Sequence, residues 1–154
     1  MAKVALGSDH AGYPVKGRIA ELLRASGDEV VDCGTDSDAP VDYPSFCIAV
    51  GEAVAEGRAD WGIVLGGSGQ GEQMAANKVC GVRAALCDSP YYALLARRDN
   101  DANVLALGAR VVAFEHVTEI IRTWKATAFE GGRHARRIGL IAAYEAHRKC
   151  EHGD

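Results

Sequence analysis

The sequence lacks the features of several large classes of protein. It has no apolar run near the roughly 18 residues that a membrane-spanning helix needs, and its first residues lack a charged segment followed by a long apolar one. It has only four prolines and 6% aromatic residues, but 48% of its residues are apolar, which excludes collagen-like, proline-rich and disordered chains. We therefore expect one globular domain over residues 1–154, located in the cytoplasm, with no membrane partner.

An excess of positive charge is also missing. The 17 basic residues are outnumbered by 21 acidic ones, so the net charge is −4 and the isoelectric point is near 5.7. This is the wrong sign for a protein whose whole surface binds nucleic acid or anionic lipid. We expect no nucleic-acid partner, although a local basic patch is compatible with this composition.

Cysteine is present, but not in the arrangement of a metal site. The chain has an odd number of cysteines, no C-x-x-C pair, and no cysteine pair at zinc-site spacing from a histidine. We therefore expect no metal. Most of the cysteines lie in apolar stretches, where a free thiol packs as a small hydrophobe in a reducing compartment. We interpret all five as packing residues: Cys33, Cys47, Cys80, Cys87 and Cys150.

Short apolar runs alternate with longer segments of helical period. The runs have the length of buried parallel strands, and they cover residues 3–8, 29–33, 61–65, 82–87 and 104–107. Between them, segments 13–25 and 43–56 each place their apolar side chains on one helical face. The alternation predicts an α/β fold with a doubly wound, five-stranded parallel sheet.

The pattern changes after the fifth run. Residues 115–129 and 133–149 are predicted to form two helices with no strand between them, and the second helix begins with a basic cluster. Cations at a helix N-terminus oppose the helix dipole, and a bound anion would remove that conflict. The preceding Gly131–Gly132 pair leaves backbone amides free for such an anion. An anion site and a solvated basic face are both compatible with the cluster, which consists of Arg133, His134, Arg136 and Arg137.

In an open parallel sheet the functional site lies beyond the carboxyl ends of the strands. The most informative segment there is 66–72, where four glycines in six residues lead from the third strand toward a helix. Such a turn exposes backbone amides and can hold an anion. Its spacing matches neither the dinucleotide fingerprint nor the P-loop, which disfavours nucleotide binding.

A carboxylate, Glu72, stands at the end of this loop. Proton abstraction next to a carbonyl requires such a base together with amides that stabilise the developing oxyanion. Each candidate also has a structural interpretation. Glu72 could only satisfy the helix dipole, Ser68 could cap the helix, Tyr43 could belong to the core, and Asp9–His10 could be a polar turn. Their convergence at strand ends favours the functional interpretation.

Five ordered segments carry a resemblance that spans nearly the whole chain. They read GSDHAG at 7–12, DYP at 42–44, GGSGQGEQMAANK at 66–78, NDANVL at 100–105 and GRHARRI at 132–138. They resemble the motifs of the type B ribose-5-phosphate isomerase family, which includes galactose-6-phosphate isomerases. The resemblance implies a cofactor-independent aldose–ketose isomerase of phosphorylated sugars with a Rossmann-like three-layer α/β/α sandwich. It also implies a homodimer, often paired into a tetramer, with sites between subunits and a C-terminal helical extension for dimerisation.

The resemblance also implies a role for each candidate. One branch of the family uses a cysteine base at the position of Gly66 and another a glutamate at the position of Glu72, so this chain resembles the glutamate branch. Glu72 would move a proton between C1 and C2 through a cis-enediolate. Ser68 and the backbone amides of Gly67, Gly69, Gln70 and Gly71 would stabilise the enediolate. The phosphate would be bound by His10, Arg133, Arg137 and a neighbouring chain's Arg110. Further substrate contacts would come from Asp9, Tyr43, Asp99 and Asn100.

One position departs from the family pattern. The pentose isomerases carry a histidine, assigned to opening the sugar ring, where this chain has Asp99. A carboxylate is normally ionised at neutral pH and cannot protonate a ring oxygen. Either another group such as Asp9 or a water opens the ring of ribose 5-phosphate, or the substrate is a tetrose 4-phosphate, such as erythrose 4-phosphate, that forms no furanose. A non-catalytic sugar-phosphate sensor is a further alternative.

Overall fold

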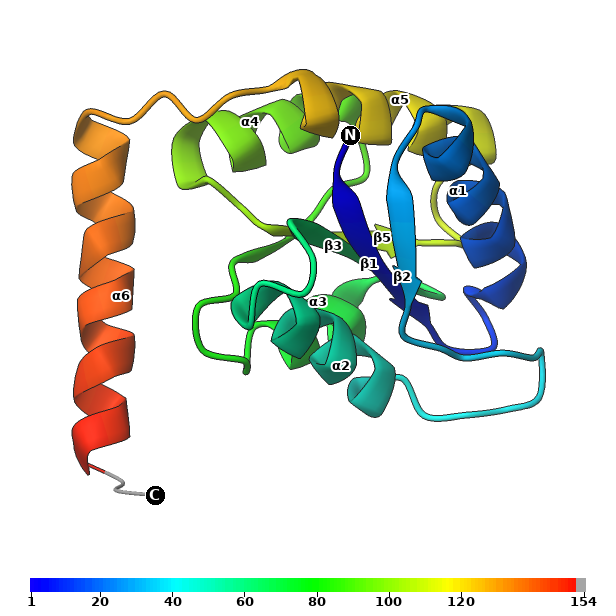
Figure 1. Ribbon diagram of the computed structural model, residues 1–154, viewed down its shortest axis with the longest axis horizontal. Coiled ribbons are helices and arrows are strands. Elements are labelled where there is room, and N and C mark those ends of the chain that lie inside the picture. Colours follow the sequence, from blue (N-terminus) through cyan, green and yellow to red (C-terminus); the bar gives the residue numbers. More distant parts are fainter. Residues whose placement is uncertain (152–154) are drawn as a thin grey trace.

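The computed structural model describes the backbone of residues 1–151 and the side chains of residues 1–148. Strands and helices alternate along most of this length (Figure 1). The elements are β1 (Lys3–Ser8), α1 (Tyr13–Ala25), β2 (Glu29–Asp32), α2 (Pro44–Ala55), β3 (Trp61–Gly66), α3 (Gln70–Ala76), β4 (Ala84–Leu86), α4 (Pro90–Asn100), β5 (Val104–Gly108), α5 (Phe114–Ala126) and α6 (Arg133–Glu151). Among the described residues, no helix combines the length and apolarity needed to cross a bilayer.

All strands of the sheet are parallel, and their order is β2-β1-β3-β5-β4. The chain moves from β1 to β2 in one direction and then returns past β1 to β3. The order therefore reverses between β1 and β3, where Ser8 pairs with Leu65. Ligands of doubly wound sheets bind at such a switch point, beyond the carboxyl ends of the strands. The predicted α/β fold and its five-stranded parallel sheet are confirmed.

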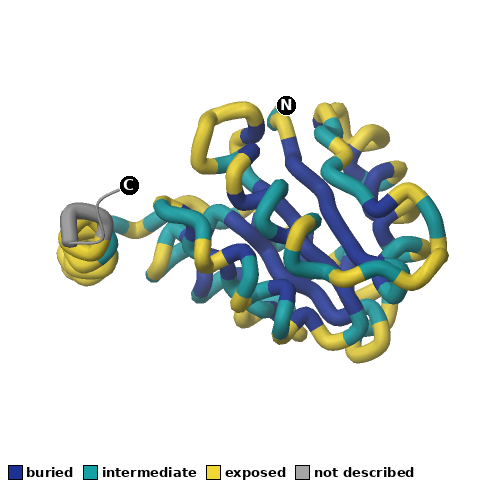
Figure 2. Tube along the Cα trace, turned by 90° about the horizontal axis from the view of Figure 1, so that it is seen from below, coloured by how far each residue is buried: buried dark blue, intermediate teal, exposed yellow. Residues whose placement is uncertain are grey.

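Helices cover both faces of the sheet and form three layers. Alternate residues of a strand point to opposite faces, so Leu6 packs among apolar residues of α1, α4 and α5, whereas Ala5 faces α2 and α3. The first layer is built from large side chains such as Ile19 and Trp124, and the second mainly from alanine, valine and cysteine. The strands are the dark core of Figure 2. Burial on both faces explains why the strands appear in the sequence as nearly continuous apolar runs.

The structure shifts several predicted boundaries. The expected strand 82–87 shortens to β4, because the amide of Arg83 bonds to the side chain of Asn103, 2.7 Å away, and not to a neighbouring strand. The expected helix 115–129 ends at Ala126, where Thr127 takes up extended backbone. The glycine loop is also shorter than predicted, since α3 begins at Gln70 and includes Glu72.

Helix α4 was not predicted, and it includes residues 98–100, which were expected to lie in a connecting segment. Ser89 caps the helix by accepting a hydrogen bond from the amide of Tyr92, and Pro90 occupies its first turn. Its buried side chains are those of Ala93 and Ala96. Alanine gives a weak apolar signal, which is why the helical period was not apparent in the sequence.

Helix α6 stands apart from the three layers (Figure 1), and Figure 2 shows that most of its described length is exposed. Its exposed apolar side chains include Leu140, Ile141 and Tyr144. A C-terminal helical extension was predicted and is present. The expected packing role of the cysteines is confirmed for Cys47 and Cys87, which are buried, whereas Cys150 lies outside the residues whose side chains are described.

Candidate active site

The carboxyl ends of β3 and β5 form the floor of the candidate site from main chain. The amide of Ala109 donates to the carbonyl of Gly66 over 2.8 Å, and that of Arg110 donates to the carbonyl of Gly67 over 3.0 Å. The backbone of Ser68 passes so close to Gly108 that a Cβ atom there would lie 2.6 Å from the Ser68 carbonyl oxygen. Gly69 adopts φ of 80°, a left-handed conformation that favours glycine, and α3 begins directly after it.

Glu72 points from the first turn of α3 toward this floor. The residue is only 4% exposed, and its carboxylate lies over Gly66, where a Cβ atom would overlap it. Burial raises the pKa of Glu72 above its ordinary value, and the nearby charge of Asp9 adds to this effect, while hydrogen bonds from the amides of Glu72 and Gly69 oppose it. A buried carboxylate with a raised pKa is a stronger proton acceptor than an exposed one, as a general base requires.

Asp9 and Cys47 approach Glu72 from neighbouring elements. Asp9 is buried, and one of its carboxylate oxygens accepts a hydrogen bond from the amide of Gly12 over 3.0 Å. Burial, followed by the charges of Glu72 and Asp9, raises the pKa of the Cys47 thiol to about 12. The thiol is therefore protonated at neutral pH and packs as an apolar group. The sequence did not indicate that Cys47 lies beside the candidate base, because its neighbours in α2 show only a packing pattern.

Four further predicted side chains follow the carboxyl ends of strands or belong to the segments that lead into α2 and α3. Ser68 is exposed, and its hydroxyl accepts a hydrogen bond from the amide of Gln70 over 3.3 Å. Tyr43 is half-buried, and its ring lies against Gly71 so closely that a side chain at Gly71 would overlap it. His10 contacts the backbone of Val41 through Nδ1, with the Val41 amide 3.1 Å away.

The fourth side chain of this group is that of Arg110. Its guanidinium lies over Gly67, with Nη1 3.3 Å from the position of a Cβ atom built there. The resemblance implied that a neighbouring chain supplies Arg110 to the site. In the structure each chain's Arg110 lies at its own glycine loop, because the segment after β5 is hydrogen-bonded to that loop. The expectation that a neighbouring chain supplies Arg110 to the site stays a prediction.

The remaining predicted residues lie at the opposite end of the strands, where β3 and β5 begin. Asp99 and Asn100 end α4, which precedes β5, and the carbonyl of Asn103 accepts a hydrogen bond from Gly62 near the beginning of β3. Glu72 follows the carboxyl end of the same strand. Arg133 and Arg137 are exposed at the beginning of α6, beside Asp99 and Asn100 and away from Glu72. One chain therefore does not bring all the predicted site residues together.

Asp99 lies within a network of charged groups. The guanidinium of Arg98 donates to both of its carboxylate oxygens, over 2.6 and 3.1 Å, and this pairing holds the pKa of Asp99 below its usual range. Nε2 of His134 lies 3.5 Å from the same carboxylate. Asp99, Glu130 and His134 approach one another within 4.8 Å, as metal ligands can. Arg98 and Arg133 already pair with the two carboxylates and supply the positive charge that a cation would bring.

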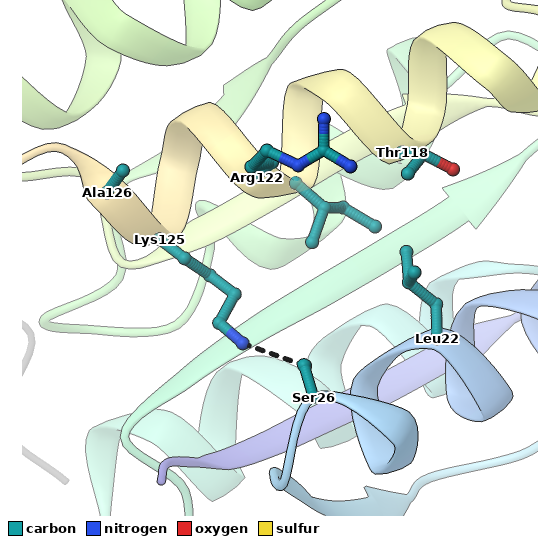
Figure 3. A pocket seen from close by; sticks show the side chains of 7 residues that line it. Leu22, Ser26, Thr118, Arg122, Lys125 and Ala126 are labelled. Atoms are coloured by element: carbon teal, nitrogen blue, oxygen red, sulfur yellow. Dashed lines mark hydrogen bonds between the residues drawn. The ribbon is translucent and has the colours of Figure 1, made fainter.

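A separate pocket of about 360 Å³ lies between α1 and α5, and none of its lining residues belongs to the glycine loop (Figure 3). Its walls are largely apolar, with Leu22 on one side and Ile121 on the other. At one end the ammonium of Lys125 donates a hydrogen bond to the hydroxyl of Ser26 over 3.0 Å. Its seven lining residues include no carboxylate, thiol or imidazole, so it offers no base for proton transfer.

A buried carboxylate over an amide-lined loop, without a nucleotide fingerprint, is the arrangement of an enzyme that moves a proton next to a carbonyl. The profile of the Ribose/Galactose Isomerase family matches residues 4–141. The chain belongs to this family. It is an intramolecular oxidoreductase that interconverts aldose and ketose forms of a phosphorylated sugar.

Individual relatives agree with this assignment over nearly their whole length. Ribose-5-phosphate isomerase B of Escherichia coli (strain K12) is 45% identical over 148 residues, which cover 96% of this chain and 99% of the relative. The structure of Clostridium thermocellum ribose-5-phosphate isomerase B superposes with a TM-score of 0.93 at 49% identity, covering 95% and 99% of the two chains. The Mycoplasma genitalium enzyme, crystallised with bound ribulose-5-phosphate, superposes with a TM-score of 0.90 at 42% identity, covering 94% and 96%.

Proposed function

We propose that this enzyme interconverts ribose 5-phosphate and ribulose 5-phosphate, or a closely similar pair, through a cis-enediolate. The observation that carries the proposal is Glu72, a buried carboxylate of raised pKa held over the glycine loop. The substrate class is supported by relatives named ribose-5-phosphate isomerase B and by ribulose-5-phosphate in one structural neighbour.

In this mechanism Glu72 removes the proton from C2 of the open-chain aldose. The electron pair of that bond forms the C1–C2 double bond, and the carbonyl oxygen at C1 takes up negative charge. Ser68 and the amides of Gly67, Gly69, Gln70 and Gly71 stabilise that charge. The hydroxyl proton at O2 moves to O1, and Glu72 returns its proton to C1, which gives the ketose. Asp9 and Tyr43 orient the substrate hydroxyls.

We infer that a second copy of the chain completes each site. Arg110 lies at the glycine loop of its own chain, and we propose that it contacts the phosphate there together with His10, which follows the carboxyl end of β1. Arg133 and Arg137 lie at the beginning of α6, at the opposite end of the strands from that loop. They would therefore serve the site of a partner, together with Asn100 and Asp99. The exposed apolar side chains of α6 support a homodimer, and pairing of dimers would give a tetramer.

A tetrose 4-phosphate is the second candidate substrate, and Asp99 is the observation that favours it. Its pKa is held low by Arg98, so the carboxylate is ionised at neutral pH and has no proton for a ring oxygen. A four-carbon aldose with its C4 oxygen esterified cannot close a furanose ring. Erythrose 4-phosphate would therefore need no ring-opening acid at position 99.

The compartment that we propose is the cytoplasm. All four cysteines whose side chains are described, Cys33, Cys47, Cys80 and Cys87, are free thiols. Free thiols persist in reducing compartments, whereas secreted domains usually pair them. This observation supports the cytoplasmic location expected from the sequence.

Initial rates on ribose 5-phosphate, allose 6-phosphate, galactose 6-phosphate and erythrose 4-phosphate test the proposal, with Glu72→Gln as the inactive control. High turnover of ribose 5-phosphate supports the pentose assignment and assigns ring opening to a group other than Asp99. Turnover confined to erythrose 4-phosphate supports the tetrose assignment. Binding of these sugar phosphates without isomerisation of any of them would contradict both and identify a sensor.

A further inference from the structure

The beginning of α6 is attached to the end of α4 by a set of charged groups, of which the proposed function uses only Asp99 and Arg133. Arg98 pairs with Asp99 and, over 3.7 Å, with Glu130. Glu130 in turn lies 3.6 Å from the guanidinium of Arg133, the first residue of α6. The Glu130 amide also donates to the carbonyl of Arg98 over 3.0 Å. The geometry of Arg133 therefore depends on groups at the end of α4.

His134 is the central member of this set. It is 6% exposed, and it is the only buried residue of α6 within the part whose side chains are described. Its Nε2 atom is buried without a hydrogen-bond partner among the described residues, yet it faces a carboxylate oxygen of Asp99 at 3.5 Å. Buried polar atoms are nearly always paired. A small approach of α6 toward α4 would turn this contact into a hydrogen bond.

We propose that Asp99 and His134 are a positioning pair that docks the beginning of α6 on α4 and so sets the place of Arg133 and Arg137. This inference rests on the proposed function, in which those two arginines bind the substrate phosphate. Farther along α6, another contact joins the Glu145 carboxylate to the amide of Gly81 over 2.8 Å. That contact fixes the distal part of the helix, whereas the arginines lie in its first turns.

The proposal gives a physical reason for an aspartate at position 99. Only an acceptor can receive the two hydrogen bonds that Arg98 donates there, and an ionised carboxylate also attracts the imidazole of His134. A histidine at this position would leave Arg98 and His134 without that acceptor. In this chain residue 99 thus acts on the substrate through the phosphate-binding arginines and not by proton donation to the sugar.

The test compares Asp99→Asn and His134→Leu with a matched control, Asp101→Asn. Asp101 also lies at the end of α4 and pairs with arginines, Arg83 and Arg97, and with none of the α6 residues whose side chains the structure describes. We expect the first two variants to raise KM for the sugar phosphate and Ki for competing inorganic phosphate by about 5- to 30-fold, the effect of losing a charged hydrogen bond. kcat should stay within about 2-fold of wild type, because the reacting carbons are held by the glycine loop.

A conservative variant separates positioning from a general structural role. His134→Gln keeps a side-chain N–H donor near Asp99, so we expect it to restore most of the phosphate affinity that His134→Leu loses. The proposal is overturned if Asp99→Asn and His134→Leu keep wild-type KM and Ki while Arg133→Ala raises both. It is also overturned if these variants lower kcat with KM unchanged, since that would place residue 99 at the reacting atoms.

Failure of the proposed function would look different. A wild-type protein that turns over no sugar phosphate contradicts the isomerase assignment for these substrates, but calorimetric titration with inorganic phosphate still measures the anion site. Weaker phosphate binding in Asp99→Asn and His134→Leu than in Asp101→Asn would then support the positioning pair. Equal binding in all three variants, or no phosphate binding by the wild type, would contradict it.

Discussion

The carboxylate of Glu72 occupies the space that a side chain at Gly66 would need. A Cβ atom built on Gly66 overlaps both the glutamate oxygen and the carboxyl carbon. A base at position 72 and a side chain at position 66 therefore exclude each other sterically. The resemblance placed the family's alternative base at position 66, and the structure gives a physical reason for finding only one of the two in this chain.

Gly66→Ala is expected to damage both activity and stability. The added methyl must displace the Glu72 carboxylate or strain the loop, and overpacking of this kind destabilises by about 1–3 kcal/mol. Thermal unfolding and initial rates measure the two effects. Gly17→Ala is the matched control, because nothing lies within 4 Å of a Cβ atom on Gly17 in α1, and alanine there should stabilise the helix by about 0.5–1 kcal/mol. If the clash is the cause, Gly66→Ala/Glu72→Ala should unfold at a higher temperature than Gly66→Ala alone.

Glu72→Gln is expected to lower kcat by at least about 100-fold, because the amide cannot accept the substrate proton. The same change should raise the unfolding temperature at neutral pH, since it removes a buried charge whose desolvation opposes folding. Glu52→Gln on the exposed side of α2 serves as the control and should leave both quantities near wild type. An unfolding temperature that falls together with kcat would contradict the buried-charge explanation.

Activity and stability should depend on pH in opposite directions through the titration of Glu72. Its pKa is raised on folding, mainly by burial, so the folded protein holds this proton at a pH where the unfolded chain has lost it. The stabilising contribution of Glu72 is thus fully present when the pH is below the pKa of Glu72 in the unfolded chain. It is lost as the pH rises through the pKa of Glu72 in the folded protein. Over the same pH range kcat/KM should rise, because Glu72 loses its proton and becomes able to act as a base. The midpoint of this rise should lie above 4.5, the ordinary pKa of a glutamate side chain. The unfolding temperature of wild type relative to Glu72→Gln, followed against pH, isolates this group.

Two variants with different defects should complement each other in mixed dimers if each site is shared between subunits. Glu72→Gln damages the glycine-loop side of a site, and Arg133→Ala damages the side that we assign to a partner chain. In a dimer of the two variants one site has both defects and the other has neither, so random pairing should recover up to about a quarter of wild-type activity. Co-expression followed by rate measurement checks this. Recovery no greater than the sum of the separate variants would mean that one chain supplies both groups.

Much of the fold followed from local pattern, because buried parallel strands produce apolar runs that the sequence shows directly. The placement of Asp9 and Glu72 beyond the carboxyl ends of their strands followed from the same reasoning, whereas the strand order, and with it the switch point between β1 and β3, did not. Helix α4 did not, since its buried face consists of alanines. The partners of Asp99 were not predictable either. The His134 contact joins residues 35 positions apart through the path of the segment before α6, which no periodicity encodes.

The floor of the site includes Gly66, Gly69 and Gly108, each of which is packed too closely to admit a side chain. Few substitutions are therefore tolerated in the glycine loop, whose backbone amides we propose contact the reacting carbonyl. Under the proposed function, new substrates within the family would arise through side chains at the rim of the site, such as those of His10 and Tyr43. A saturation mutagenesis screen for altered sugar preference should accordingly find its variants at rim positions, while the glycines tolerate almost no replacement.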